Sequence, residues 1–243
     1  MNIELLYPEI CCLYGDKGNS RYLIKCLEEN GVKVNVIETH LDEKPRFLEE
    51  DIQLVYIGSL ADTYITTLLD RLMPHQETIL KKIDSGQVIL ATGNALELFI
   101  KKIEWEDGKI MDGLGVFDAK SIHQIPNRFN SLFFGELLEN GKEIAGYSSR
   151  FSHVYPNAGE ERFLAKAKRG TGNHEGCEWE GFKYKNLLAT NLLGPILVLS
   201  PNFTISVLTK IGISQPKLAF ESDVREAFEV RKREYLDPKV NLS

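Results

Sequence analysis

Short apolar runs alternate with helical stretches in the first third of the chain. Ile3 to Tyr7 is an apolar run, and Ser20 to Asn30 places apolar side chains three and four residues apart and stops at Gly31. The first pattern predicts a strand, and the second predicts an amphipathic helix with a glycine cap. Val32 to Glu38 and Ile52 to Ile57 predict two further strands. This order of elements predicts a parallel, doubly wound sheet.

The next segment predicts a helix that leads into a tight turn. Tyr64 to Asp84 has helical spacing interrupted by Pro74, and Gly86 ends it. Residues 88–99, which we call the elbow, then read as a buried strand, a glycine turn at Thr92-Gly93 and a helix. In α/β proteins such a turn presents a nucleophile beside the N–H groups of the helix N-terminus. Taken alone, the pattern favours a core strand followed by a helix that Thr92 caps, because such patterns are common in any α/β fold.

The second half of the chain predicts added antiparallel strands. Short strand patterns occupy residues 109–119, 131–139, 143–148 and 162–167. Asn140-Gly141 lies between two of them and is typical of a type I′ hairpin turn. Residues 202–212 and 223–234 predict terminal helices, the last one highly charged and therefore expected to be exposed. We expect a mostly parallel, doubly wound α/β domain over residues 1–212 and a C-terminal extension over residues 213–243.

The composition is that of an ordinary soluble globular protein. The chain has 243 residues, of which 43% are hydrophobic and 26% are charged, and its formal net charge is -6. Nucleic-acid binding requires clustered Lys and Arg, so an acidic chain is a poor candidate for that function. The N-terminus has no basic region or long apolar core, and no apolar run approaches the length of a membrane span. We therefore expect a cytoplasmic protein without membrane insertion.

The residues that commonly ligate metals are not spaced as ligands. Four cysteines lack both zinc-ligand spacing and the spacing of a disulfide framework, namely Cys11, Cys12, Cys26 and Cys177. We interpret them as reduced thiols, mostly packing residues. Asp16 and Asp62 lie in predicted loops, where aspartates more often cap a turn or helix. The sequence therefore predicts no metal and no cofactor.

Three segments carry a resemblance to a known family. They are Leu13 to Asn19 (LYGDKGN), Met111 to Asp118 (MDGLGVFD) and Tyr184 to Leu197 (YKNLLATNLLGPIL). Each motif is modest alone, but the three together in this order are specific. From about residue 3 to residue 212 the chain resembles class I (triad) glutamine amidotransferases of the cobyric-acid-synthase-like branch, among them the glutaminase subunit of lipid II isoglutaminyl synthase. The resemblance implies the amidotransferase fold.

The catalytic positions of that family fall on unreactive residues in this chain. Its elbow resembles Cys-Gly-Gly-Tyr-Gln-x-Leu, whose nucleophilic cysteine falls on Thr92 and whose two glycines fall on Gly93 and Asn94. A second motif resembles Gly-Thr-Tyr-Leu-His-Gly-Pro, whose histidine base falls on Leu193 and whose tyrosine falls on Asn191. A threonine hydroxyl becomes a nucleophile only beside a base, and leucine is not a base. The resemblance therefore implies a glutaminase site that has lost its reactive groups.

The loop that stabilises the oxyanion in that family also departs from its pattern. Members carry a run resembling Gly-Gly-Gly-Ser-Asp, where this chain has Gly58-Ser59-Leu60-Ala61-Asp62. The central glycines are missing, which argues against a backbone N–H aimed at an oxyanion. His153 lies in the strand region that helps form the family's glutamine pocket, although a structurally bonded histidine is the more frequent outcome. By resemblance, the pocket candidates are Gly58, Gly93, Asn94, Arg150, His153 and Asn191.

These substitutions predict a pseudo-glutaminase that acts through binding or complex formation. In the resembling family, the glutaminase pairs with a Mur-ligase-like synthetase that uses ATP to amidate the peptidoglycan precursor. By analogy, this chain is expected to dock on such a ligase or on another amidating enzyme. One alternative is an active amidotransferase with a relocated nucleophile, in lipid II or cobyric-acid-type amidation. Another is a small-molecule-binding module that uses the old glutamine pocket.

Overall fold

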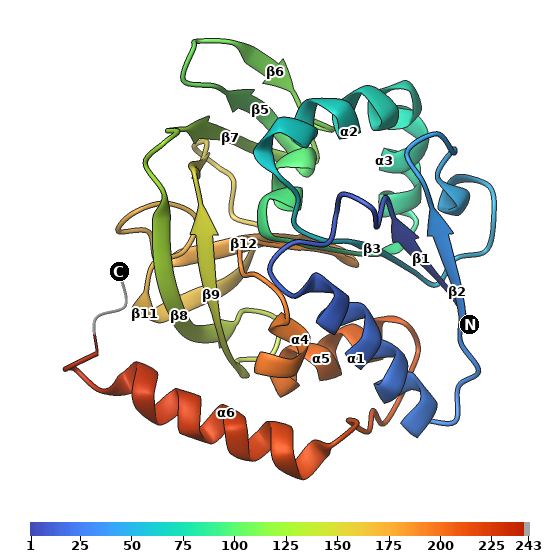
Figure 1. Cartoon of the computed structure of the whole chain (residues 1–243), viewed down its shortest axis with the longest axis vertical. Helices are drawn as coiled ribbons and strands as arrows, with labels where there is room; N and C mark the ends of the chain where they lie inside the picture. Colours follow the sequence, from blue (N-terminus) through green and yellow to red (C-terminus); the bar gives the residue numbers. More distant parts are fainter. Residues whose placement is uncertain (241–243) are drawn as a thin grey trace.

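The computed structural model describes residues 1–240, and a nine-stranded sheet forms its centre (Figure 1). In spatial order the strands are β2 (Asn35–Thr39), β1 (Asn2–Leu6), β3 (Leu54–Ile57), β4 (Val88–Thr92), β13 (Leu187–Thr190), β12 (Trp179–Tyr184), β11 (Phe163–Gly170), β8 (Phe129–Leu137) and β9 (Glu143–Arg150). The first five strands are parallel to one another, and the remaining pairs are antiparallel. The predicted parallel sheet with antiparallel strands from the second half of the chain is confirmed.

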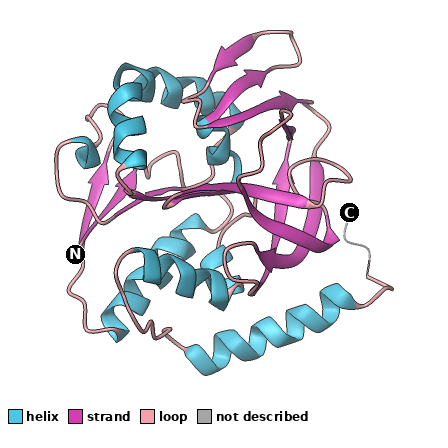
Figure 2. Cartoon of the chain, turned by 180° about the vertical axis from the view of Figure 1, so that it is seen from behind, coloured by secondary structure: helices cyan, strands magenta, loops and turns pink. Residues whose placement is uncertain are grey.

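Helices cover both faces of the parallel part of the sheet, which Figure 2 shows nearly edge-on. One face carries α1 (Asp16–Glu29), α4 (Ile196–Leu199) and α5 (Pro201–Lys210), and the other carries α2 (Ile65–Leu72) and α3 (Gln76–Asp84). Alternate side chains of β4 therefore enter two cores. Ile89 and Ala91 pack in the core under α2 and α3, while Val88 and Leu90 pack in the core under α1 and α5. Because this strand is buried on both faces, its sequence is apolar without alternation.

A second, four-stranded sheet is attached through the elbow. Its strands are, in spatial order, β10 (Ser152–Pro156), β7 (Phe117–His123), β5 (Ile100–Glu104) and β6 (Ile110–Asp112). The 3-10 helix η4 (Gly93–Phe99) connects β4 of the main sheet directly to β5 of the second sheet. The single strand predicted over residues 109–119 is divided into β6 and β7, because the N–H groups of Gly113 and Leu114 bond to carbonyls of Lys101 and Leu98.

Several local predictions are refined by the structure. The helix predicted over Tyr64 to Asp84 is interrupted at Pro74 as expected, by the 3-10 helix η3 (Met73–His75). Helix α1 begins at Asp16, so the predicted start at Ser20 is wrong and Asp16 lies in the helix rather than in a loop. The hairpin at Asn140-Gly141 is present, but only Gly141 has a positive φ (+67°), whereas a type I′ turn requires positive φ at both residues. Further 3-10 helices are η1 (Arg46–Leu48) and η2 (Asp62–Tyr64).

The charged C-terminal helix α6 (Glu221–Leu236) packs against the antiparallel half of the molecule (Figure 1). Its side chains Val224, Phe228 and Tyr235 are buried, and the last two form an apolar cluster with Phe134 and Ala145. The expectation of an exposed helix is therefore correct only for its charged face. Between residues 1 and 240, no helix is long and apolar enough to cross a bilayer.

Candidate functional site

The sharp turn of the elbow occurs at Gly93. Thr92 is the last residue of β4 and has an extended backbone (φ −117°, ψ 149°), whereas Gly93 has φ +61°. A nucleophile elbow places its reactive residue on the strained turn itself. A Cβ atom on Gly93 would lie 2.9 Å from Leu193 Cδ2 and 2.2 Å from Ser59 Oγ. Position 93 thus has the positive φ that an elbow nucleophile adopts and faces Leu193, whereas the resemblance aligned the nucleophile with Thr92.

The side chain of Thr92 belongs to a buried polar cluster on the α1 side of the elbow. Its hydroxyl donates to Asp16 Oδ1 (2.9 Å), which also accepts from the Tyr56 hydroxyl (2.7 Å). Burial raises the pKa of the Asp16 carboxyl, while these hydrogen bonds lower it. Thr92 is fully buried and does not line the cavity at the elbow. Its contacts make it a structural residue that joins β4 to α1.

The base position is filled by an apolar side chain. Leu193 follows β13, its N–H donates to the Tyr147 carbonyl (2.9 Å), and its side chain is buried. Neither a cysteine nor a histidine lines the cavity next to it among the described residues. Three of the four cysteines are buried and none is bridged, as expected. Burial raises the pKa of the Cys11 thiol well above its usual range, which makes this thiol a poor nucleophile.

Two backbone N–H groups of the oxyanion loop (Gly58–Asp62) already donate to side chains. The N–H of Ser59 donates to Asp16 Oδ2 (2.6 Å), and the N–H of Leu60 donates to Asn94 Oδ1 (3.0 Å). The Asn94 amide donates in return to the Leu60 carbonyl (2.8 Å). An oxyanion hole requires donors that point at the developing charge, so this loop lacks two of the donors it could have offered.

Gly58 has a packing role. A Cβ at Gly58 would lie 2.3 Å from the Cys11 carbonyl oxygen, so only glycine fits at that position. Gly58 is also outside the cavity lining. The sequence identified this residue through the family pattern, and the structure gives it a steric reason.

A small cavity remains at the elbow, and most of the predicted pocket residues line it. The space open to water is about 10 Å³, which is enough for about one water molecule. Five residues named from the sequence line it: Gly93, Asn94, Arg150, Asn191 and Leu193. The other lining residues are Tyr14, Leu60, Asp62, Arg128, Ser149 and Phe151. A cavity of this size does not admit glutamine without rearrangement.

The side chain of Arg128 closes the cavity from outside. Its Nη1 donates to the Tyr14 hydroxyl (2.7 Å) and to Ser149 Oγ (3.2 Å), and its guanidinium lies 4.2 Å from the centre of the Phe151 ring. The sequence did not indicate Arg128 or Phe151, because both lie at strand ends where no periodic pattern marks them. Tyr14 was part of a recognised motif but was given no role.

Arg150 lies deeper, beside a buried carboxyl group. Its Nη2 donates to the Gly172 carbonyl (2.5 Å), while Nε and Nη1 have no hydrogen-bond partner among the described residues. Burial lowers the pKa of Arg150 to about 10 and raises the pKa of Glu180 to about 7. Glu180 accepts from the N–H (2.8 Å) and the side-chain amide (3.3 Å) of Asn191, which fixes Asn191 at the cavity wall.

His153 does not reach the cavity. It lies on β10, is buried, and packs at 5.0 Å between ring centres against Phe129. Burial and the nearby Arg150 charge lower its pKa, so the ring is neutral at pH 7. The structure thus gives His153 a packing contact and leaves it away from the elbow.

The comparisons with known proteins agree with this architecture. The chain matches the CobB/CobQ-like glutamine amidotransferase domain over residues 3–198. It is similar to the lipid II isoglutaminyl synthase (glutamine-hydrolyzing) subunit GatD of Streptococcus pneumoniae, with 26% identity over 215 residues, 86% of this chain and 79% of that protein. It is also similar to the GatD subunit of Staphylococcus aureus, with 27% identity over 232 residues, 94% of this chain and 91% of that protein.

Solved amidotransferase structures share the fold. One glutamine amidotransferase has a TM-score of 0.55 at 15% identity, covering 87% of this chain and 99% of that chain. The glutaminase domain of Trypanosoma brucei CTPS, solved with bound acivicin, has a TM-score of 0.53 at 8% identity, covering 90% of this chain and 98% of that chain. With the domain match spanning most of its length, this chain belongs to the CobB/CobQ-like glutamine amidotransferase family.

Proposed function

We propose that this chain is a pseudo-glutaminase, an amidotransferase-like protein that has lost glutamine hydrolysis and acts by binding a partner enzyme. The observation that carries the proposal is the contact at the elbow, where Gly93 faces the apolar side chain of Leu193. We assign the nucleophile position to Gly93 rather than Thr92, because the left-handed turn occurs there. Either assignment leaves the site without a thiol.

The substituted nucleophile and base positions support the proposed loss of glutamine hydrolysis. A nucleophile and its base act as a unit, and loss of either one costs several orders of magnitude in rate. Here both positions are substituted, and the Ser59 and Leu60 N–H groups are occupied by Asp16 and Asn94. Thr92 is no substitute nucleophile, because its hydroxyl is fully buried beside Asp16 and does not line the elbow cavity, so a substrate in that cavity would not meet it. An active amidase with a relocated nucleophile therefore finds no support at the elbow.

The proposed partner is a Mur-ligase-like synthetase or another amidating enzyme. The two GatD relatives are named as subunits of lipid II isoglutaminyl synthase, and the chain covers 79% and 91% of their lengths. The inference of a shared binding surface rests on this likeness to the two subunits, by analogy. We infer that binding, rather than ammonia production, is the function that remains.

The first experiment measures ammonia release from glutamine by the purified chain, with a GatD relative as the positive control. No release above background is expected, with or without a Mur-ligase-like protein from the same genome. A glutamine-directed electrophile should also leave residues 92 and 93 unlabelled. Ammonia release that disappears in Thr92→Ala would overturn the proposal of inactivity.

The second experiment tests the partner. Co-expression with the Mur-ligase-like protein of the same genome should give a complex that co-elutes in size-exclusion chromatography. Leu193→Ala alters only the buried cavity and serves as a matched variant that should keep the complex. Failure of the two proteins to associate at micromolar concentration would remove the complex-forming part of the proposal and leave the inactivity test unaffected.

A second candidate function, small-molecule binding, is favoured by a different cavity. A cavity of about 290 Å³ lies between α1 and the ends of β1, β2 and β3, and its lining includes Cys12, Lys17, Arg21 and Glu38. Its size is close to that of small-ligand sites, unlike the space at the elbow. A bound ligand would slow alkylation of Cys12 and raise Tm. Arg21→Ala should abolish the rise in Tm. This candidate function is contradicted if no small anion raises the Tm of the wild type.

A further inference from the structure

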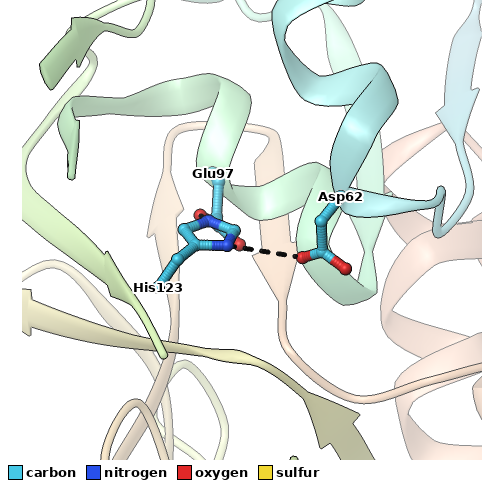
Figure 3. A group of neighbouring side chains, drawn as sticks. All are labelled: Asp62, Glu97 and His123. Atoms are coloured by element: carbon cyan, nitrogen blue, oxygen red, sulfur yellow. Dashed lines mark hydrogen bonds and ion pairs between the residues drawn. The ribbon is translucent and has the colours of Figure 1, made fainter. Parts of the chain in front are cut away.

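Three side chains that no motif connects converge behind the elbow (Figure 3). Asp62 comes from the oxyanion loop at the start of η2, Glu97 from η4, and His123 from the end of β7. One ligand atom from each lies within 4.8 Å of the others. Glu97 and His123 are almost fully buried, and Trp105 stacks on the imidazole at 4.1 Å between ring centres. Ligand spacing along the sequence led to the prediction of no metal. That criterion overlooks residues that are far apart in the sequence but close in the fold.

Hydrogen bonds to Glu97 determine which imidazole nitrogen carries the proton. The Glu97 carboxylate accepts from Ser121 Oγ (2.6 Å) and Ser152 Oγ (2.7 Å). Its Oε2 atom also lies 2.8 Å from His123 Nε2. A carboxylate only accepts, so Nε2 carries a proton and donates. In the neutral ring, the lone pair is then on Nδ1, which has no hydrogen-bond partner among the described residues although it is buried.

The separation between Nδ1 and Asp62 fits a shared metal ion better than a hydrogen bond. The Nδ1 atom lies 3.6 Å from Asp62 Oδ1, as the dashed line in Figure 3 marks. An N–H···O bond is about 2.7–3.2 Å long. Two ligand atoms on one tetrahedral zinc, each about 2.1 Å from it, lie about 3.4 Å apart. We propose that His123 Nδ1 and Asp62 bind one divalent transition-metal ion of the zinc class, with Glu97 orienting the imidazole ring.

The surroundings agree with this site. Metal-binding histidines usually donate their second ring N–H to a carboxylate, the arrangement that Glu97 and His123 make. Burial lowers the pKa of His123, but Glu97 and Asp62 outweigh it and raise that pKa above its ordinary value, so a divalent cation at Nδ1 would replace the proton that otherwise balances the two carboxylates. Asp62 also lines the elbow cavity, so about one water molecule has space on that side of the cluster. This inference concerns binding and does not depend on the proposed loss of glutaminase activity.

The test titrates Zn²⁺ into the full chain after treatment with a chelator, in competition with a chromophoric chelator. One equivalent should bind to the wild type, and Asp62→Asn should weaken binding by at least about tenfold to a hundredfold, because even the loss of a residue that only orients a ligand costs that much. His123→Gln should abolish binding. His174→Gln is the matched control, because His174 lies on a loop beside Cys177 and outside the cluster, and it should bind like the wild type.

Two further readouts keep the result decisive. Co²⁺ in place of Zn²⁺ should give visible bands of nitrogen and oxygen coordination without a thiolate band, which separates this site from the four cysteines. If His123→Gln fails to fold, Asp62→Asn decides, provided that its Tm without zinc is unchanged. Absence of stoichiometric zinc binding overturns the proposal, and so does wild-type affinity in Asp62→Asn. Either result would make the cluster an imidazolium held between two carboxylates.

Discussion

Substituting Gly93 by alanine measures how tightly the elbow is closed. The backbone at Gly93 has φ +61°, and a left-handed residue with a Cβ costs about 1–2 kcal/mol. The new methyl group would lie 2.2 Å from Ser59 Oγ and 2.9 Å from Leu193 Cδ2, and overpacking of this kind costs about 1–3 kcal/mol. We expect the free energy of unfolding to fall by about 2–5 kcal/mol, and Tm to fall by on the order of 10 °C.

Matched variants separate the two contributions. Gly31 has φ +73° and nothing within 4 Å of its Cβ position, so Gly31→Ala should show only the backbone cost of about 1–2 kcal/mol. Ser59→Gly combined with Gly93→Ala removes the closest contact and should recover much of the steric loss. Urea denaturation of the four proteins gives the free energies directly. Steric crowding at position 93 is refuted if Gly93→Ala lowers the free energy of unfolding no more than Gly31→Ala does.

Three further outcomes follow from the site. Gly93→Cys with Leu193→His should still release no measurable ammonia, because each missing oxyanion donor costs about a hundredfold to a thousandfold in turnover; turnover like that of an active GatD would show that the site was intact. Asn94→Ala should lower the free energy of unfolding by about 1–3 kcal/mol in urea titrations, because it leaves the Leu60 N–H and carbonyl unpaired. Burial raises the pKa of Glu180 from its ordinary value of 4.5 to about 7 in the folded chain. Its contribution to the free energy of unfolding is therefore fully present below pH 4.5 and is lost as the pH rises through about 7. Glu180→Gln should remove that part of the pH dependence, and a stability profile parallel to the wild type from pH 4 to 8 would contradict it.

Local patterns predicted the strands of the first 99 residues, but they missed β5, β10, β12 and β13 and did not determine the geometry of the turn. The apolar run of β4 and the glycine at position 93 located the elbow, because a strand buried on both faces has a distinctive sequence. Motif matching then placed the cysteine position on Thr92, since it paired a family glycine with Gly93. The positive φ of Gly93 is the observation on which we propose position 93 instead. Glycine's tolerance of positive φ was the signal in the sequence that favoured Gly93.

Contacts between distant segments were not accessible from the sequence. Arg128 closes the cavity by reaching Tyr14, which lies 114 residues away along the chain. Glu97 and His123 meet because η4 leads into the second sheet, in which β7 pairs with β5. Neither contact has a local period or a fixed spacing. Such sites become visible only when the order of strands is known, because that order decides which loop ends are neighbours.

The substitutions at the elbow compensate one another, and this favours a scaffold kept for another use. A cysteine truncated to glycine would by itself leave a void, and voids in a packed interior are destabilising. Here Leu193 Cδ2 approaches the space where that side chain would begin. If residues 58–62 no longer bind an oxyanion, their backbone N–H groups need other acceptors. The N–H of Ser59 donates to the Asp16 carboxylate, and the N–H of Leu60 donates to the Asn94 side chain. Under the proposed loss of glutaminase activity, continued selection for a stable fold would account for these contacts better than decay of an unused enzyme. Under the proposed loss of glutaminase activity, binding is the function that the chain keeps, so the partner assay is the more informative of the two functional experiments.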